Sequence, residues 1–300
     1  MKKMINKSNI EGLLYETTLE EREAGPNARQ PGAKYISGNL SIQITEDNIV
    51  DVRIFENEIT RAGKKNQKYD TLSSLINGNS VVSVGKDDAV AISVNSALSL
   101  NDWHRPDGTL LSTVQNENGF INLISKGSMD PKATFETDML IASTRDEMAK
   151  SADGTMEASG ALVVKGYIFD FADRILPVEF TVENEDGAEY FRDMEPNTFT
   201  KVWGKQVTTT ETVQQTEKSA FGADKVVEFT NTKKKMVITG TNVEPYMFGE
   251  EGILTVQEVQ DAIAARNVYL ADQKSRSSQQ ATVKAEPKVV TDPTTATFTF

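Results

Sequence analysis

The chain has 300 residues, 38% hydrophobic and 25% charged, with a formal net charge of −12, which fits a folded protein long enough for two domains. It has no cysteine, which excludes disulfides, thiolate metal sites and a cysteine nucleophile, and its single histidine, His104, excludes multi-histidine metal sites. No hydrophobic run approaches the roughly 20 residues of a membrane span, and no hydrophobic signal-peptide core follows the basic start. We therefore expect a cytoplasmic protein without membrane contact.

Short alternating segments separated by turns indicate a β-rich fold. The first block begins with a hairpin at 37–58, "SGNLSIQITEDNIVDVRIFENE", whose alternation places Arg53 and Phe55 on the outer face. Its inner face is hydrophobic and comprises Leu40, Ile42, Ile44, Val50, Val52 and Ile54. A short helix at 69–78, stopped by Gly78, and strands at 88–100 and 133–143 follow.

A second block repeats this order. The hairpin 165–185, "KGYIFDFADRILPVEFTVENE", aligns Gly166 with Gly38 and Val178 with Val52. It is followed by a helix at 186–194 and strands at 197–207 and 233–240. The small polar segment 148–160 between the blocks is typical of a linker. The sequence thus predicts two similar β domains.

The C-terminal part begins as a helix. Thr255 and Glu258 form a capping-box signature, and Val256, Val259, Ile263 and Leu270 follow at helical spacing. This hydrophobic stripe packs either on the second domain, the interpretation we favour, or on a partner. Residues 276–300 lose periodicity and are expected to be disordered; their aromatic ends, Phe298 and Phe300, are either a partner-binding site or part of a frayed terminus.

The segment 197–206, "NTFTKVWGKQ", is the main candidate for function. As a strand it presents Phe199, Lys201, Trp203 and Lys205 on one face, and alternating aromatic and basic side chains can stack on bases and neutralise phosphates. Basic clusters elsewhere are solvated loops or further phosphate contacts. The aromatic residues 167, 169 and 171 are either core or stacking surface. The candidate nucleic-acid contacts are Arg53, Phe55, Arg61, Lys64, Lys65, Lys68, Tyr167, Phe169, Lys201, Trp203, Lys205, Lys233, Lys234 and Lys235.

The chain resembles tandem OB-fold single-stranded-DNA-binding proteins of the bacteriophage type, over Asn9 to Pro245. The resemblance rests on the paired hairpin–helix–strand blocks, on "FTKVWGKQ" and "KKKMVITG", and on the tail ending in Phe300. The resemblance implies a mainly β chain with two OB-fold-like five-stranded barrels and short helices, then a C-terminal helix and a flexible tail. The expected divisions are 1–147, linker 148–160, 161–250, helix 251–275 and tail 276–300. Such proteins often have a strongly acidic tail, whereas residues 271–300 are close to neutral.

We therefore expect a non-enzymatic protein without cofactor or metal that binds single-stranded DNA without strong sequence preference, during replication or recombination. It would act in the cytoplasm, that of the host cell if it is phage-encoded. Phe298 and Phe300 would contact replication or recombination proteins, and homo-oligomerisation stays open. The alternatives are a β-rich protein-binding or phage structural module without nucleic-acid affinity and, third, a nuclease. No nucleotide-binding or nucleophile-elbow motif is present, and the acidic pairs lie where turns are expected.

Overall fold

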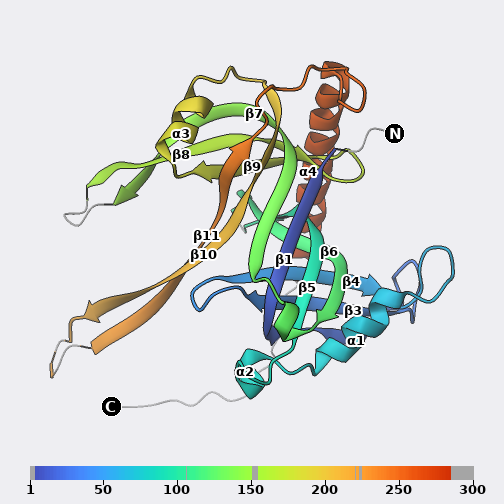
Figure 1. Cartoon of the computed structure of the whole chain (residues 1–300). Coiled ribbons are helices and arrows are strands. Elements are labelled where there is room, and N and C mark those ends of the chain that lie inside the picture. The colour runs from blue at the N-terminus through green and yellow to red at the C-terminus, as the bar shows by residue number, and fades with distance from the viewer. Residues whose placement is uncertain (1–3, 106, 151–154, 220, 223–224, 285–300) are drawn as a thin grey trace, which may run out of the picture.

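The computed structural model describes residues 4–105, 107–150, 155–219, 221–222 and 225–284 and is mainly β (Figure 1). The strands are β1 (Asn6–Thr17), β2 (Glu20–Glu23), β3 (Lys34–Gln43), β4 (Ile49–Asn57), β5 (Ala91–His104), β6 (Leu110–Ile124), β7 (Lys132–Lys150), β8 (Met156–Phe169), β9 (Ile175–Val182), β10 (Phe199–Glu217) and β11 (Lys225–Thr241). The helices are α1 (Gln67–Ile76), α2 (Val81–Val84), the 3-10 turn η1 (Lys126–Ser128), α3 (Glu185–Arg192) and α4 (Val256–Lys284).

Two five-stranded barrels have the same strand pairing. In the first, β1 pairs with β3 and β5, β3 pairs with β4, β5 pairs with β6, and a parallel β4–β6 contact closes the barrel. In the second, β7 pairs with β8 and β10, β8 with β9, β10 with β11, and β9 runs parallel to β11. A helix between the third and fourth strand of each barrel, α1 or α3, completes the OB-fold order. The expected fold class is confirmed.

The aligned glycines of the two hairpins have the same structural role. A Cβ atom on Gly38 would lie 2.2 Å from the carbonyl oxygen of Thr18, and one on Gly166 would lie 2.3 Å from that of Leu140. In both barrels the second strand therefore passes so close to the first that only glycine fits. The weak sequence repeat thus reports a real geometric requirement.

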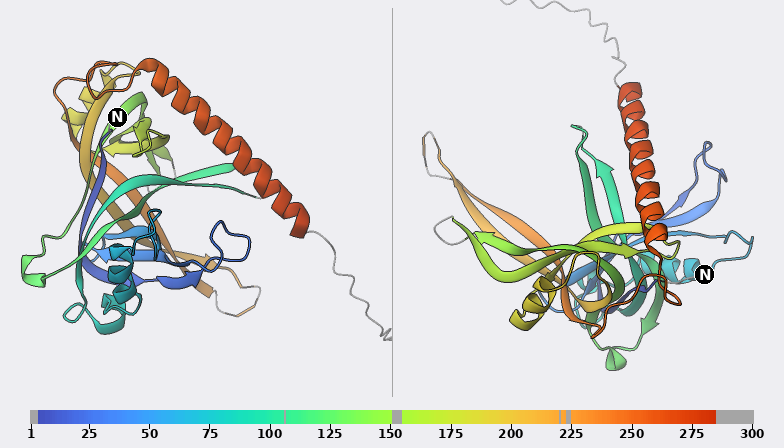
Figure 2. Two further views of the ribbon diagram at one scale, coloured as in Figure 1. Left: turned by 90° about the vertical axis from the view of Figure 1, so that its right-hand side faces the viewer. Right: turned by 90° about the horizontal axis from the view of Figure 1, so that it is seen from above.

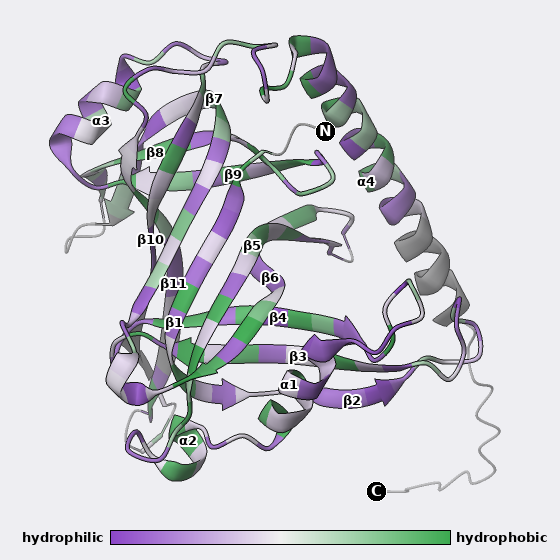
Figure 3. Ribbon diagram, turned by 45° about the vertical axis from the view of Figure 1, so that its right-hand side comes forward, coloured by the Kyte–Doolittle hydropathy of each residue, from purple (hydrophilic) through white to green (hydrophobic). Residues whose placement is uncertain are grey.

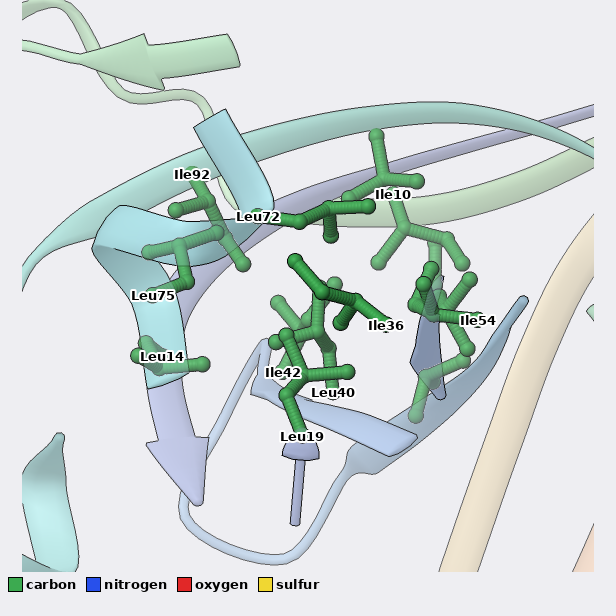
Figure 4. Packing of buried hydrophobic residues seen from close by; sticks show 14 of the residues in the cluster. Ile10, Leu14, Leu19, Ile36, Leu40, Ile42, Ile54, Leu72, Leu75 and Ile92 are labelled. Atoms are coloured by element: carbon green, nitrogen blue, oxygen red, sulfur yellow. The ribbon is translucent and has the colours of Figure 1, made fainter. Parts of the chain in front are cut away.

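Each barrel has its own hydrophobic core. Figure 4 shows the first, in which Leu40, Ile42 and Ile54 from the hairpin pack against Leu72 of α1. The second core contains the corresponding positions Val164, Ile168, Val178 and Phe180, with Phe191 from α3. In Figure 3 hydrophobic and hydrophilic residues alternate along many strands, as expected for barrels with one buried face. The alternation of the first hairpin places Gln43 on its outer face with Arg53 and Phe55, but Gln43 is buried.

The boundary between the barrels differs from the expectation. The strand at 133–143, assigned to the first block, belongs to β7, the first strand of the second barrel. The fifth strand of the first barrel is β6, which was not predicted. Residues 148–150, expected in a linker, pair with residues 156–158 in the β7–β8 hairpin. β1 pairs with β7 through Asn6–Glu11, so the two barrels share one sheet.

Three hairpins project beyond the barrels. They are formed by the distal parts of β5–β6, β7–β8 and β10–β11, and Figure 2 shows the last two on the same side of the molecule. The strands β10 and β11 are much longer than expected, because their Thr- and Gln-rich outer parts give no hydrophobic alternation. Within the described residues no helix combines the length and hydrophobicity required to span a membrane.

The C-terminal helix α4 packs on the second barrel. The predicted capping box is present, with the Glu258 amide donating to Thr255 Oγ1 at 3.2 Å and the Thr255 amide donating to Glu258 Oε2 at 2.7 Å. Val259 is buried, and Ile263 packs against the same cluster as Phe169 and Phe199. The helix runs to Lys284, so the start of the expected disordered tail at 276 is helical. Phe298 and Phe300 lie outside the described residues.

Candidate nucleic-acid interface

A groove of about 950 Å³ lies where the two barrels meet. Its walls come from residues 112–116 of β6, 206–208 of β10 and 233–236 of β11, with Asp51, Arg53, Arg145, Glu147 and Glu179 from β4, β7 and β9. We call this the inter-barrel groove. All three projecting hairpins contribute to it, so segments far apart in sequence meet around one opening.

The charge of the groove lining is positive although the chain is acidic. Its cationic side chains are Arg53, Arg145, Lys233, Lys234 and Lys235, and its acidic side chains are Asp51, Glu147 and Glu179. Four of these five cations were predicted as nucleic-acid contacts from the sequence. Arg145 was missed because it stands alone between Thr144 and Asp146, with no basic neighbour in sequence. A local positive lining on an acidic protein is the distribution expected for binding a polyanion.

Each acidic side chain of the groove is paired with a cation. Lys234 Nζ lies 2.5 Å from Asp51 Oδ2, and Lys235 Nζ lies 2.7 Å from Glu147 Oε1. Glu179 is bonded by Arg145 at 3.0 Å and by Lys165 at 2.8 Å. The hydrogen bond from Lys235 lowers the pKa of Glu147 below its ordinary value. The bond from Lys165 is the main cause of the lowered pKa of Glu179.

The floor of the groove is a buried polar network between the barrels. Asn116 Nδ2 donates to Gln206 Oε1 at 2.8 Å, and Gln206 Nε2 donates to Ser8 Oγ at 2.6 Å. Ser8 in turn donates to Asn116 Oδ1 at 2.7 Å. These side chains lie on β1, β6 and β10, so the network fixes β10 of the second barrel against two strands of the first. Asn48 adds bonds to the backbone of residues 206 and 208.

An exposed patch of aromatic and basic side chains lies on the first barrel, next to the groove. The Phe55 side chain is 48% exposed and its ring centroid is 5.1 Å from that of Tyr35. Phe120, which is 65% exposed, has the Lys68 ammonium 4.2 Å above its ring. Phe55 stands two positions after Arg53 on the outer face of β4, so this patch continues from the groove. Phe120 was missed because β6 was not predicted.

The neighbouring basic loop is exposed. Arg61 and Lys64 are solvent-accessible, whereas Lys65 pairs with Asp70 at 2.8 Å and Lys68 with Glu56 at 3.3 Å. Their positions on the first barrel are compatible with phosphate contact. The two ion pairs reduce the positive charge that the loop offers.

The 197–206 segment alternates as predicted, but of its residues only Gln206 belongs to the described groove lining. Thr200, Val202 and Gln206 are buried on the inner side. On the outer side Lys201 pairs with Glu136 at 3.2 Å, Lys205 is exposed and Trp203 is 40% exposed. A Cβ atom on Gly240 would lie 2.5 Å from the Trp203 ring, so the indole lies flat on β11. The remaining residue of that face, Phe199, is buried.

Phe169 is a correction to the candidate set. It is completely buried, and its ring meets that of Phe199 edge-on at 5.9 Å, because α4 and the segment before it cover this end of the second barrel. It therefore belongs to the core. Tyr167 is half-buried and lines, with Lys165, a cavity of about 580 Å³. This cavity shares the lining residues Ser112, Val114 and Glu179 with the groove. Phe171, left open between core and surface, is 88% exposed in the β8–β9 turn.

Helix α4 reaches the groove indirectly. Arg266 Nη2 donates to Asp102 Oδ1 at 2.9 Å, and their side chains are only 13% and 5% exposed. The same Asp102 oxygen accepts a bond from Ser112 Oγ, which lines the groove. Figure 2 shows the β5–β6 hairpin extending toward α4. Among the described residues no group of three or more His, Cys, Asp or Glu side chains could hold a metal ion.

Three solved structures resemble this fold. A deletion mutant of the single-stranded DNA binding protein from Thermus aquaticus matches with a TM-score of 0.50 at 13% identity, covering 84% of this chain and 100% of that chain. The wild-type protein from Thermus aquaticus matches with a TM-score of 0.49 at 12% identity, covering 82% and 95%. The mitochondrial single-stranded DNA binding protein Rim1 from S. cerevisiae matches with a TM-score of 0.23 at 16% identity, covering 40% and 96%.

At this identity the first likeness shows the fold alone, and it agrees with the OB-fold pairing of the strands. No curated protein matches the chain by sequence. The YorF family model, in contrast, matches residues 4–276, which is most of the chain. The chain therefore belongs to the YorF family.

Proposed function

We propose that this protein binds single-stranded DNA without strong sequence preference and acts, without catalysing a reaction, in replication or recombination. The observation that carries the proposal is the inter-barrel groove, where Arg53, Arg145 and Lys233 to Lys235 converge from both barrels. The fold shared with the Thermus aquaticus single-stranded DNA binding protein supports it. The second and third strands of an OB fold are a common oligonucleotide-binding surface, and β4 is the third strand of the first barrel.

The groove cations supply phosphate contacts, and the adjoining aromatic patch supplies stacking. Phe55 and Phe120 are exposed next to Arg53 and Lys68, and each base stacked on such a ring contributes about 1–3 kcal/mol. Trp203 with Lys201 and Lys205 forms a separate candidate contact on the outer face of the second barrel. Since phosphate contacts release counterions, affinity falls as salt rises.

The polar floor of the groove supports the proposal that binding is sequence-tolerant. Asn and Gln side chains read bases through free amide donors and acceptors. Here both Asn116 NH₂ bonds go to the Asp51 carbonyl and Gln206 Oε1, and Gln206 Nε2 donates to Ser8 and Asn116. These donors are already used within the protein, so the floor offers little direct base recognition.

The test is fluorescence anisotropy of a labelled oligo-dT titrated with the full chain at low and moderate salt, with duplex DNA as competitor. We expect tight binding that weakens with salt and that duplex displaces poorly. Phe120→Ala and Lys233→Ala should weaken binding, whereas Lys86→Ala, on an exposed lysine paired with Glu46 and absent from the groove lining, should not. No binding at micromolar protein in low salt refutes the proposal and favours a protein-binding or phage structural role.

A further inference from the structure

The acidic side chains of the inter-barrel groove are placed where phosphates would have to bind. Asp51, Glu147 and Glu179 are the acids among the described residues of its lining, and each contacts a cation of the same lining. The pairs cross between elements: Asp51 joins β4 to β11, Glu147 joins β7 to β11, and Glu179 joins β9 to β7. Lys234 and Lys235 of "TKKKM" are therefore already bonded to a carboxylate.

These pairs are accessible to solvent. The exposed fractions are 58% for Lys234 and 41% for Asp51, and 32% for Lys235 and 22% for Glu147. Arg145 and Glu179 are both 49% exposed. Ion pairs of this exposure are weak and are screened by salt, so an incoming phosphate can replace the carboxylate at a modest cost.

The carboxylates are also held independently of these cations. Ser41 Oγ donates to Asp51 Oδ1 at 2.7 Å, Ser159 Oγ donates to Glu147 Oε2 at 3.0 Å, and Lys165 holds Glu179. When a cation turns toward a phosphate, its former partner consequently stays in the groove. The acid then remains as a negative charge close to the DNA backbone.

We propose that in the free protein Asp51, Glu147 and Glu179 bond the groove cations that contact DNA phosphates in the complex, and that they limit affinity by competing with the phosphates for these cations. The inference rests on the proposed function. Removing the three acidic charges leaves five cations and no acidic side chain among the described residues of the lining. Affinity and salt dependence should then both rise, since each freed cation adds a phosphate contact.

The experiment compares wild type with Asp51→Asn, Glu147→Gln and the triple variant that adds Glu179→Gln. Oligo-dT dissociation constants are measured by anisotropy across a salt series. We expect each single variant to bind several-fold more tightly at low salt, with a slope of log K against log salt steeper by about 0.7 per freed cation. Glu46→Gln is the matched control, because it breaks the exposed Lys86 pair, whose residues are absent from the groove lining.

A second variant links the gain to its cation. Adding Lys234→Ala to Asp51→Asn should abolish the tighter binding, because Lys234 is the cation that Asp51 releases. If wild type binds and the folded triple variant, checked by its melting temperature, binds no more tightly, this inference is wrong while the proposed function stands. If neither binds at low salt, both are wrong.

Discussion

The pair Arg266–Asp102 is expected to fix the β5–β6 hairpin to helix α4, and its removal gives a quantitative test. The pair is 2.9 Å long with side chains 13% and 5% exposed. At an effective dielectric constant of about 20, two charges at this distance attract by about 5–6 kcal/mol, offset in part by desolvation. Arg266→Met leaves Asp102 charged, buried and bonded only to Ser112 among side chains. We expect a loss of about 3–5 kcal/mol, as for other buried pairs that lose one partner.

The assay combines urea unfolding with hydrogen exchange of the backbone amides. The stability loss should be accompanied by faster exchange in the β5–β6 hairpin, residues 98–116, because the ion pair no longer holds it to α4, although Gln273 still donates to the Asp102 carbonyl. The double variant Asp102→Asn/Arg266→Met should recover part of the stability, since no uncompensated charge remains. The reasoning is refuted if Arg266→Met loses less than about 1 kcal/mol of unfolding free energy. It is also refuted if the double variant loses as much as the Arg266→Met and Asp102→Asn single variants added together.

Three further predictions concern other sites. Trp203→Ala should weaken oligo-dT binding without unfolding the protein. Since the side chain is 40% exposed, the variant loses about 150 Å² of buried area, and the free energy of unfolding measured in urea should fall by roughly 3 kcal/mol. Unchanged affinity would show that Trp203 is not part of the interface. Gly166→Ala should lower the melting temperature strongly, as its Cβ would lie 2.3 Å from a carbonyl oxygen, whereas Gly25→Ala has open space. Burial raises the pKa of Asp138, so the stability that its protonated form contributes below the ordinary pKa is lost as pH rises through the raised pKa. Asp138→Asn should flatten this part of the plot of urea midpoint against pH. A plot identical to that of wild type would contradict the prediction.

The sequence predicted the elements whose residues carry a local signal. The hairpin repeat with Gly38 and Gly166, the inner face of β4 and the cap at Thr255 all depend on neighbours in sequence, and all three are confirmed. The outer parts of β10 and β11 were missed because their sequences give no hydrophobic alternation. The strand 133–143 was assigned to the wrong barrel, because partner choice depends on contacts with β8 and β10.

The candidate site was predictable only in part. Lysine clusters are visible in sequence, and Lys233 to Lys235 do line the groove with Arg53. Their carboxylate partners are distant in sequence, so no local pattern indicated that Asp51 or Glu147 would meet them. The sequence could not decide between the core and the surface for Phe169, because the residues that cover it come from the C-terminal part of the chain.

The strand pairing between β1 and β7 ties the folding history of the two barrels together. The Ile5 amide donates to Asp138 across 133 positions of the chain, and β1 reaches its full set of neighbours only with β7 in place. During synthesis the edge of β1 that pairs with β7 is therefore expected to stay unpaired until the second barrel emerges from the ribosome. A cut between the barrels would leave two fragments with complementary unpaired strand edges, so the barrels are parts of one continuous sheet and not two independent domains joined by a linker.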